Sequence, residues 1–120
     1  MNILPIYSNY VFTEYLKGEG GLEKNAYEKR AKRLYEVIDK CKIYKPRVVE
    51  EFRSPITITW NIEDPDILQQ CMDEGAKNHL HDFKGHRAIG GLRASLFCPI
   101  PDEAVYRLAD FLEDFAQKYE

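Results

Sequence analysis

Residues 84–97, KGHRAIGGLRASLF, carry the pattern that decides the fold of this 120-residue chain. From residue 92 onward, small or aliphatic side chains alternate with polar or bulky ones. That period of two predicts a half-buried β-strand with Arg93 and Ser95 on one face. Gly85 lets the main chain turn sharply beside the basic residues, and the glycine pair at residues 90–91 lets a bulky group approach the main chain ahead of this strand. We therefore expect flexible glycines on both sides of the basic residues, followed by a strand.

Helical patterns lie on both sides of this strand. Downstream, Pro101 and Asp102 begin a predicted helix with one apolar stripe. The members of that stripe are Val105, Leu108, Leu112, Phe115 and Tyr119. Upstream, Asp64 fits an N-cap and Pro65 the first position of a helix that runs to about Lys77.

Two further helices are predicted near the N-terminus. Apolar residues recur every three or four positions from residue 22 to about residue 42, which predicts the longest helix. A looser helical pattern over residues 5–17 is ended by glycines at positions 18, 20 and 21. We expect a short N-terminal helix on a glycine hinge, followed by the main body of the fold.

Three more segments have strand character. Residues 56–60, ITITW, are rich in β-branched and aromatic side chains, which strands prefer. Residues 47–50 predict a short edge strand, and residues 80–83 a second short strand. The fold class is therefore α+β: a two-layer sandwich with a small, mostly antiparallel sheet, helices packed on one face, and an N-terminal helix. We expect one domain over residues 1–120, with residues 1–21 as linker and N-terminal helix and residues 22–120 as its core.

Composition limits the classes of function. The chain is 44 % hydrophobic and 31 % charged, which is a globular composition, and its formal net charge of -3 disfavours nucleic acid or an anionic membrane as its partner. Neither a membrane span nor a signal peptide is predicted, so a cytoplasmic protein is expected. The three cysteines, Cys41, Cys71 and Cys98, have no short pairing and are expected to be buried small hydrophobic residues.

The segment that carries chemistry is basic, although the chain is acidic. Residues 83–101 contain no carboxylate, yet they hold Lys84, His86, Arg87 and Arg93. Guanidinium groups bind carboxylate and phosphate through paired hydrogen bonds, so two separated arginines suit a ligand with two acidic ends. A solvated loop beside a strand edge would show the same composition, and composition alone does not decide between the two.

Two other charged patterns have simpler interpretations. His79, His81 and Asp82 are potential metal ligands, but their spacing matches no established site, and we interpret them as ordinary loop residues. The charges at residues 28–33 are interpreted as a solvated helix face with ion pairs between positions i and i+4. Neither pattern requires a function.

The string at residues 84–97 closely resembles the C-terminal signature of the phosphoserine aminotransferases, in which a lysine-glycine-histidine-arginine turn leads to a glycine pair and an arginine. The resemblance extends to residues 2–10, 20–22, 30–39, 44–45, 53–54 and 101–103, and so to nearly the whole chain. Three positions depart from the family pattern: Pro55, His79 and the pair Phe97-Cys98. Because proline lacks a backbone donor, Pro55 predicts an altered approach to the first long strand.

The resemblance implies the small C-terminal domain of a pyridoxal-phosphate enzyme of class V and fold type I, which moves an amino group between glutamate and 3-phosphohydroxypyruvate in serine synthesis. By that likeness, Arg93 takes the substrate α-carboxylate. His86 and Arg87 would hold the distal phosphate of phosphoserine, or the side-chain carboxylate of a glutamate-like dianion, in a site shared between the subunits of a dimer.

The same resemblance implies what the chain lacks. None of its lysines has the family's Schiff-base context, and about 120 residues cannot contain both a cofactor domain and this small one. We therefore expect no catalytic residue and no cofactor in this chain, and no transamination by it alone. A homodimer or association with a full-length aminotransferase subunit is the expected assembly. The rival interpretation is a non-catalytic interaction module that docks through apolar surface.

Overall fold

The computed structural model describes residues 2–18, 24–97 and 99–120 of the chain. In chain order the elements are α1 (Ile3–Gly18), α2 (Lys24–Lys40), β1 (Tyr44–Pro46), the short 3-10 helix η1 (Glu50–Phe52), β2 (Thr57–Ile62), α3 (Pro65–Lys77), β3 (Leu92–Ser95) and α4 (Asp102–Tyr119). The predicted helices and the two predicted strands that begin near residues 56 and 92 are confirmed, with shifts of a few residues at their ends.

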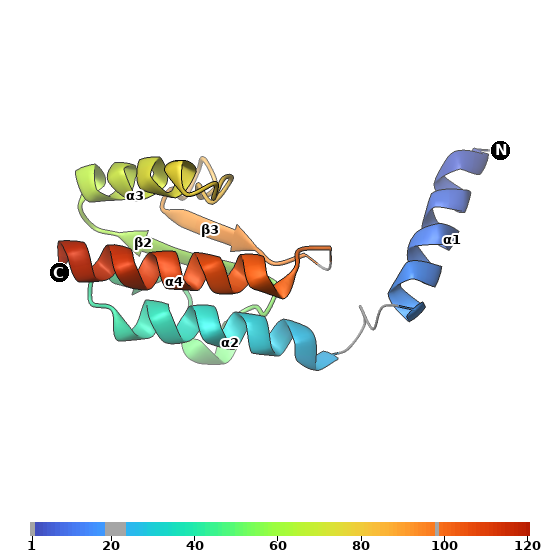
Figure 1. The fold of residues 1–120 in the computed structure, drawn as a ribbon, viewed down its shortest axis with the longest axis horizontal. Coiled ribbons are helices and arrows are strands. Elements are labelled where there is room, and N and C mark those ends of the chain that lie inside the picture. Colours follow the sequence, from blue (N-terminus) through green and yellow to red (C-terminus); the bar gives the residue numbers. More distant parts are fainter. Residues whose placement is uncertain (1, 19–23, 98) are drawn as a thin grey trace.

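The three strands form one antiparallel sheet in the order β1-β2-β3. Trp60 in the central strand lies between Pro46 of β1 and Leu92 of β3. Helices α2, α3 and α4 lie together on one side of this sheet (Figure 1). The predicted α+β sandwich of two layers is therefore confirmed.

The core lies between the sheet and the three helices. Every second residue of β2 is buried, namely Ile58, Trp60 and Ile62, so this strand turns one face to the helices. The buried stripe of α4 consists of Val105, Leu108, Ala109, Leu112, Phe115 and Ala116. This stripe matches the prediction except that Tyr119 is only half-buried.

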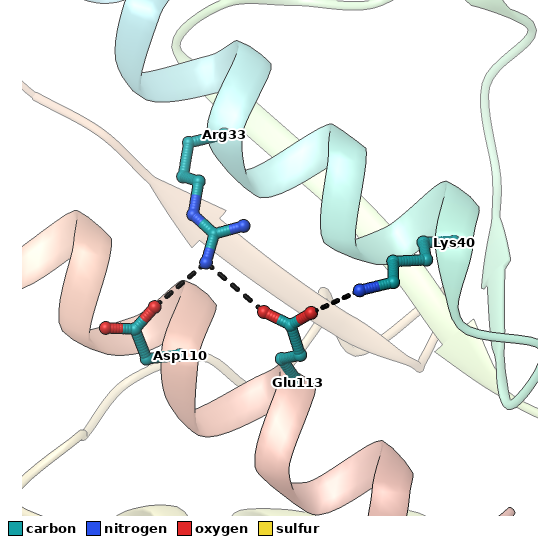
Figure 2. A network of polar contacts seen from close by, with 4 residues as sticks. All are labelled: Arg33, Lys40, Asp110 and Glu113. Carbon is teal, nitrogen blue, oxygen red and sulfur yellow. Dashed lines mark hydrogen bonds and ion pairs between the residues drawn. The ribbon is translucent and has the colours of Figure 1, made fainter.

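Ion pairs join α2 to α4 above that apolar contact (Figure 2). Nη2 of Arg33 lies 2.9 Å from Oδ1 of Asp110 and 3.3 Å from Oε2 of Glu113. Nζ of Lys40 lies 2.6 Å from Oε1 of the same Glu113. The hydrogen bonds from Lys40 and Arg33 lower the pKa of Glu113. The ion pairs predicted between positions i and i+4 within residues 28–33 do not occur among the described residues; Arg30 and Arg33 pair instead with Asp102 and Asp110 of α4.

Both predicted short strands are wrong. The edge strand ends at Pro46 instead of covering residues 47–50, because proline cannot donate a further ladder bond, and the chain then enters η1. Residues 80–83 do not form a strand either. His79 and Asp82 both have φ of 62°, which interrupts an extended backbone, and only Lys84 then bridges to Leu92.

Helix α3 begins and ends as its sequence indicates. At its start, Oδ1 of Asp64 accepts from the backbone N–H groups of Asp66 and Ile67, as the predicted N-cap should. At its end, the backbone N–H of His79 donates to Ala76 and that of Leu80 donates to Gly75. This pair of bonds is the Schellman motif, whose left-handed position is usually glycine but is His79 here.

Helix α1 differs from the other helices because none of its residues is buried. Its exposed apolar side chains are Ile3, Leu4, Ile6, Tyr7, Tyr10, Val11, Phe12 and Tyr15. It makes no contact with another described helix or strand, and it stands apart from them in Figure 1. Among the described residues, no helix has the length and apolar character that a membrane crossing requires.

Two of the three cysteines are buried, as predicted. Burial raises the pKa of the Cys71 thiol to about 12 and also raises the pKa of Cys41. The third, Cys98, lies outside the described residues. Buried thiols with raised pKa values are poor nucleophiles, so Cys41 and Cys71 are packing residues.

Candidate anion-binding site

The turn at residues 85–91 is closed by its own backbone. The N–H of Gly85 donates to the carbonyl of Gly91 at 2.8 Å, and the N–H of Gly90 donates to the carbonyl of His86 at 2.7 Å. A Cβ at Gly85 would lie 2.1 Å from the carbonyl oxygen of Gly90, which no side chain tolerates. Glycine at position 85 is therefore what allows the two arms of the turn to meet.

The glycine pair at the end of the turn has a different role. Gly90 and Gly91 have φ values of 71° and 70°, in the left-handed region that glycine enters without strain. A Cβ at Gly91 would also lie 2.8 Å from the carbonyl oxygen of Trp60 in β2. These two residues reverse the chain so that β3 can begin against the sheet at Leu92.

The three residues proposed from the sequence line one hollow. His86 and Arg87 are exposed on the turn, and Arg93 is half-buried on β3, where it pairs with Thr59 of β2. Together with Gly85 and Ala88 they surround an open space of about 690 Å³. The turn and the strand that the sequence predicts thus bring all three cationic or donor side chains to a common space.

The imidazole of His86 is oriented by the turn itself. Its Nδ1 accepts a hydrogen bond from the backbone N–H of Ala88 at 3.2 Å. In a neutral imidazole, a nitrogen that accepts leaves the proton on the other nitrogen, so Nε2–H is the donor available to a ligand. His86 can therefore donate to an anion without first being protonated.

The basic side chains of the turn and of β3 form no ion pair with an acidic residue among the described residues. No Asp or Glu in the ranges 2–18, 24–97 and 99–120 comes within ion-pair distance of Lys84, His86, Arg87 or Arg93. Arg30, Arg33 and Arg53, by contrast, all pair with carboxylates. Two separated guanidinium groups with free donors can each bind a carboxylate or phosphate through two hydrogen bonds.

Arg93 also borders a second hollow of about 460 Å³ beside the edge of β3. Its apolar walls come mainly from Phe83, Leu96, Ile100 and Leu108. The aliphatic part of Arg93 can lie along this apolar wall while its guanidinium stays in the polar hollow. Arg93 thus lies between the apolar hollow and the cationic hollow.

Arg53 is held by the protein and is not free for a ligand. Its Nη1 and Nη2 contact the two carboxylate oxygens of Asp39 at 2.6 and 2.8 Å, and its guanidinium lies 4.7 Å from the centroid of the Tyr35 ring. The bond to Asp39 raises the pKa of Arg53. The neighbouring Ser54 Oγ accepts from the backbone N–H groups of residues 56 and 57, so this arginine-serine pair fixes the entry to β2.

One residue near the site escaped the sequence analysis. Arg47 follows β1, and its Nη2 donates to the carbonyl oxygen of Ile89 in the turn at 2.8 Å. Residues 47 and 89 are 42 positions apart, and only the sheet register brings them together. The sequence offers no signal for this contact beyond a basic residue after a proline.

The pattern of His79, His81 and Asp82 does not gather ligands for a metal. All three side chains are exposed on the loop after α3. Within the described ranges, no group of three or more His, Cys, Asp or Glu side chains is placed to hold a metal ion.

Comparison with proteins of known structure gives the same fold. Phosphoserine aminotransferase from Bacillus circulans subsp. alkalophilus superposes with a TM-score of 0.84 at 29 % sequence identity, over 89 % of this chain and 30 % of that one. The pyridoxal-phosphate-bound phosphoserine aminotransferase from Trichomonas vaginalis superposes with a TM-score of 0.80 at 27 % identity, over 89 % of this chain and 31 % of that one.

Comparison with curated sequences agrees. The phosphoserine aminotransferase of Shewanella woodyi is 35 % identical over 122 residues, which cover 98 % of this chain and 34 % of the relative. The putative phosphoserine aminotransferase of Schizosaccharomyces pombe is 36 % identical over 124 residues, or 98 % of this chain and 32 % of the relative. No family model matches.

The chain thus spans about a third of the length of the curated relatives it matches, and nearly all of its own residues take part in that match. The sequence resemblance and the shared fold agree with the part of the family predicted from residues 84–97. This chain therefore resembles the phosphoserine aminotransferases in sequence and in fold, over the third of their length that corresponds to their small C-terminal domain.

Proposed function

We propose that this chain is the substrate-binding part of a phosphoserine aminotransferase, and that it holds phosphoserine or a glutamate-like dianion in the hollow between the turn and β3. Arg93 takes the α-carboxylate, and His86 with Arg87 takes the distal phosphate or carboxylate. The observation that supports this most is the shared hollow, whose cations have no acid within ion-pair distance among the described residues. The setting is serine synthesis in the cytoplasm.

The chain does not carry out transamination alone under this proposal. Pyridoxal phosphate needs a lysine amine for its Schiff base. The residues around the hollow are Gly85, His86, Arg87, Ala88 and Arg93, and none of them is a lysine or an acid for the pyridine nitrogen. These residues do not fit the cofactor, so under this proposal the hollow binds the substrate and supplies no group for the Schiff base.

Calorimetric titration with phosphoserine tests the binding role. Loss of one charge-assisted contact costs about 1.5–3 kcal/mol, or roughly a 10- to 100-fold weaker affinity, and we expect that loss for Arg93→Ala. The matched control is Arg107→Ala, because Arg107 donates to the carbonyl of Asn78 and does not line the hollow. A wild-type chain that binds no phosphoserine, or an equal loss in both variants, would refute the binding role.

Added pyridoxal phosphate tests the claim that the chain is not an enzyme by itself. We expect the absorbance of the free aldehyde, with no aldimine band, after excess reagent is removed. A stoichiometric aldimine band that survives dialysis would overturn this part of the proposal, whatever the phosphoserine titration shows.

A second function, docking onto another polypeptide, is supported by α1. Its exposed apolar side chains lie on a helix that contacts no other described element, and surfaces of this kind usually mark an interface. The occupant we propose is an intact aminotransferase subunit or a second copy of the chain. Size-exclusion chromatography with light scattering should show a dimer, which Tyr7→Glu with Val11→Glu converts to a monomer. Asn9→Glu is the control, and a wild-type monomer that binds no subunit would exclude docking.

A further inference from the structure

Arg47 lies at the end of the sheet from which the turn projects. It directly follows Pro46, which pairs with Trp60, and Trp60 in turn pairs with Leu92. Gly91, the last residue of the turn, directly precedes Leu92. The sheet register therefore brings Arg47 and the closing residue of the turn to neighbouring positions, although they are far apart in the sequence.

The guanidinium of Arg47 lies against the backbone of the turn. Its Nη2 donates to the carbonyl oxygen of Ile89 at 2.8 Å. A Cβ at Gly91 would lie 3.1 Å from both Nε and Nη2 of Arg47, so the guanidinium closely approaches this glycine. A planar group with several donors can keep such a contact better than a flexible ammonium can.

Among the described residues, the other hydrogen bonds of the turn join atoms of the turn itself. Its backbone bonds run between Gly85 and Gly91 and from residues 89 and 90 to His86, and the imidazole of His86 is bonded to Ala88. In the part of the chain that the structure describes, the bond from Arg47 is the one side-chain hydrogen bond that reaches residues 85–91 from outside. Arg47 is thus the external support of the segment that carries His86 and Arg87.

We propose that Arg47 is a positioning residue of the anion site, which fixes the turn at residues 85–91 and so the direction of His86 and Arg87. It does not line the hollow itself, so it acts through the turn and does not contact the ligand. This inference rests on the proposed function for its effect on affinity, but the support of the turn exists without any ligand.

The first test is amide hydrogen exchange in the free chain, followed by nuclear magnetic resonance. We expect Arg47→Ala to speed exchange at Gly85 and Gly90 about five- to tenfold, the effect of losing one hydrogen bond, without a change in the midpoint of urea unfolding. Arg107→Ala is the matched control, since it removes an arginine-to-carbonyl bond of the same kind at Asn78. Exchange that is unchanged by Arg47→Ala overturns the proposal.

The second test is phosphoserine affinity in Arg47→Ala, Arg47→Gln and Arg47→Lys. Positioning predicts about a five- to tenfold loss in all three, because the lysine keeps the charge but not the planar donor group. Full affinity in Arg47→Lys would mean that charge alone matters, and would overturn the proposal. If Arg47→Ala does not fold, Arg47→Gln decides both measurements. If the wild-type chain binds no phosphoserine, the proposed function fails, and the exchange rates still decide whether Arg47 supports the turn.

Discussion

The α2–α4 interface and the turn at residues 85–91 both carry arginines, but they place them in opposite surroundings. In the interface, Arg33 pairs with Asp110 and Glu113, and Lys40 pairs with the same Glu113, above a buried apolar stripe (Figure 2). In the turn, Arg87 is exposed on a backbone of closely packed glycines, and no acid of the described residues pairs with it. Paired charges over apolar contacts stabilise the fold, whereas unpaired cations on a rigid turn remain available to an anion.

The two regions therefore have different roles: the interface stabilises the fold, and the turn carries the residues proposed to bind an anion. A domain of this size has little stability to spare, so its core must come from the contacts between the helices and the sheet. Binding residues are more often carried by connecting segments that a rigid scaffold positions. We expect that damage to the interface lowers stability first, and that damage to the turn lowers anion binding first.

The largest expected effect is in the interface. Leu112 of α4 is fully buried, so Leu112→Ala should lower the free energy of unfolding by about 2–5 kcal/mol, through lost apolar contact and the cavity left behind. Urea unfolding followed by circular dichroism measures it. The control is Leu4→Ala on α1, where Leu4 is 72 % exposed and the expected change is within about 0.5 kcal/mol. Equal losses of stability at the two leucines would mean that burial in α4 contributes no more to stability than exposure on α1.

A smaller effect is expected in the turn. Gly85→Ala places a Cβ against the carbonyl oxygens of Gly90 and Gly91, and the strain should cost about 1–3 kcal/mol. The turn can relieve this strain only by opening, which also moves His86. Phosphoserine affinity should therefore fall much more than it does in Leu112→Ala measured under conditions where that variant is folded. Gly18→Ala is the control, because nothing lies near its Cβ. A tight-binding Gly85→Ala variant would contradict the closed turn.

The main elements of the fold could be predicted because their signals are local. Asp64 and Pro65 mark the start of α3, and the apolar spacing from Val105 onward marks the buried face of α4. The turn and the strand position of Arg93 could also be predicted, because the glycines, the basic residues and the alternating strand pattern all lie in one short segment. A sequence pattern within one segment was enough to predict a helix or strand wherever that segment's own residues determine its conformation.

The errors have a different physical origin. Residues 80–83 have strand-like side chains, but His79 and Asp82 adopt positive φ and prevent an extended run. The resemblance did mark His79 as a departure from the family pattern, and its place in the Schellman motif is one that glycine usually takes. The partners of Arg33 and Arg47 lie on other elements, at Asp110 and Ile89, so no pattern within one segment contains them.

The smallest expected effect concerns pH and the charges of the interface. Because Lys40 and Arg33 lower the pKa of Glu113, the unfolded chain takes up this proton more readily than the folded one. The stabilisation is fully present above the ordinary glutamate pKa and is lost as pH falls through that value toward the lower folded one.

Urea midpoints measured from about pH 7 to about pH 3 should thus converge for wild type and Glu113→Gln. Arg87→Gln in the turn should follow wild type throughout, because no acid of the described residues pairs with Arg87. Added salt should shrink the Glu113→Gln difference, since these charges are near the surface. A constant gap down to the lowest pH would mean that Glu113 stabilises the interface by packing, and the contrast between paired and unpaired cations would then rest on the apolar stripe alone.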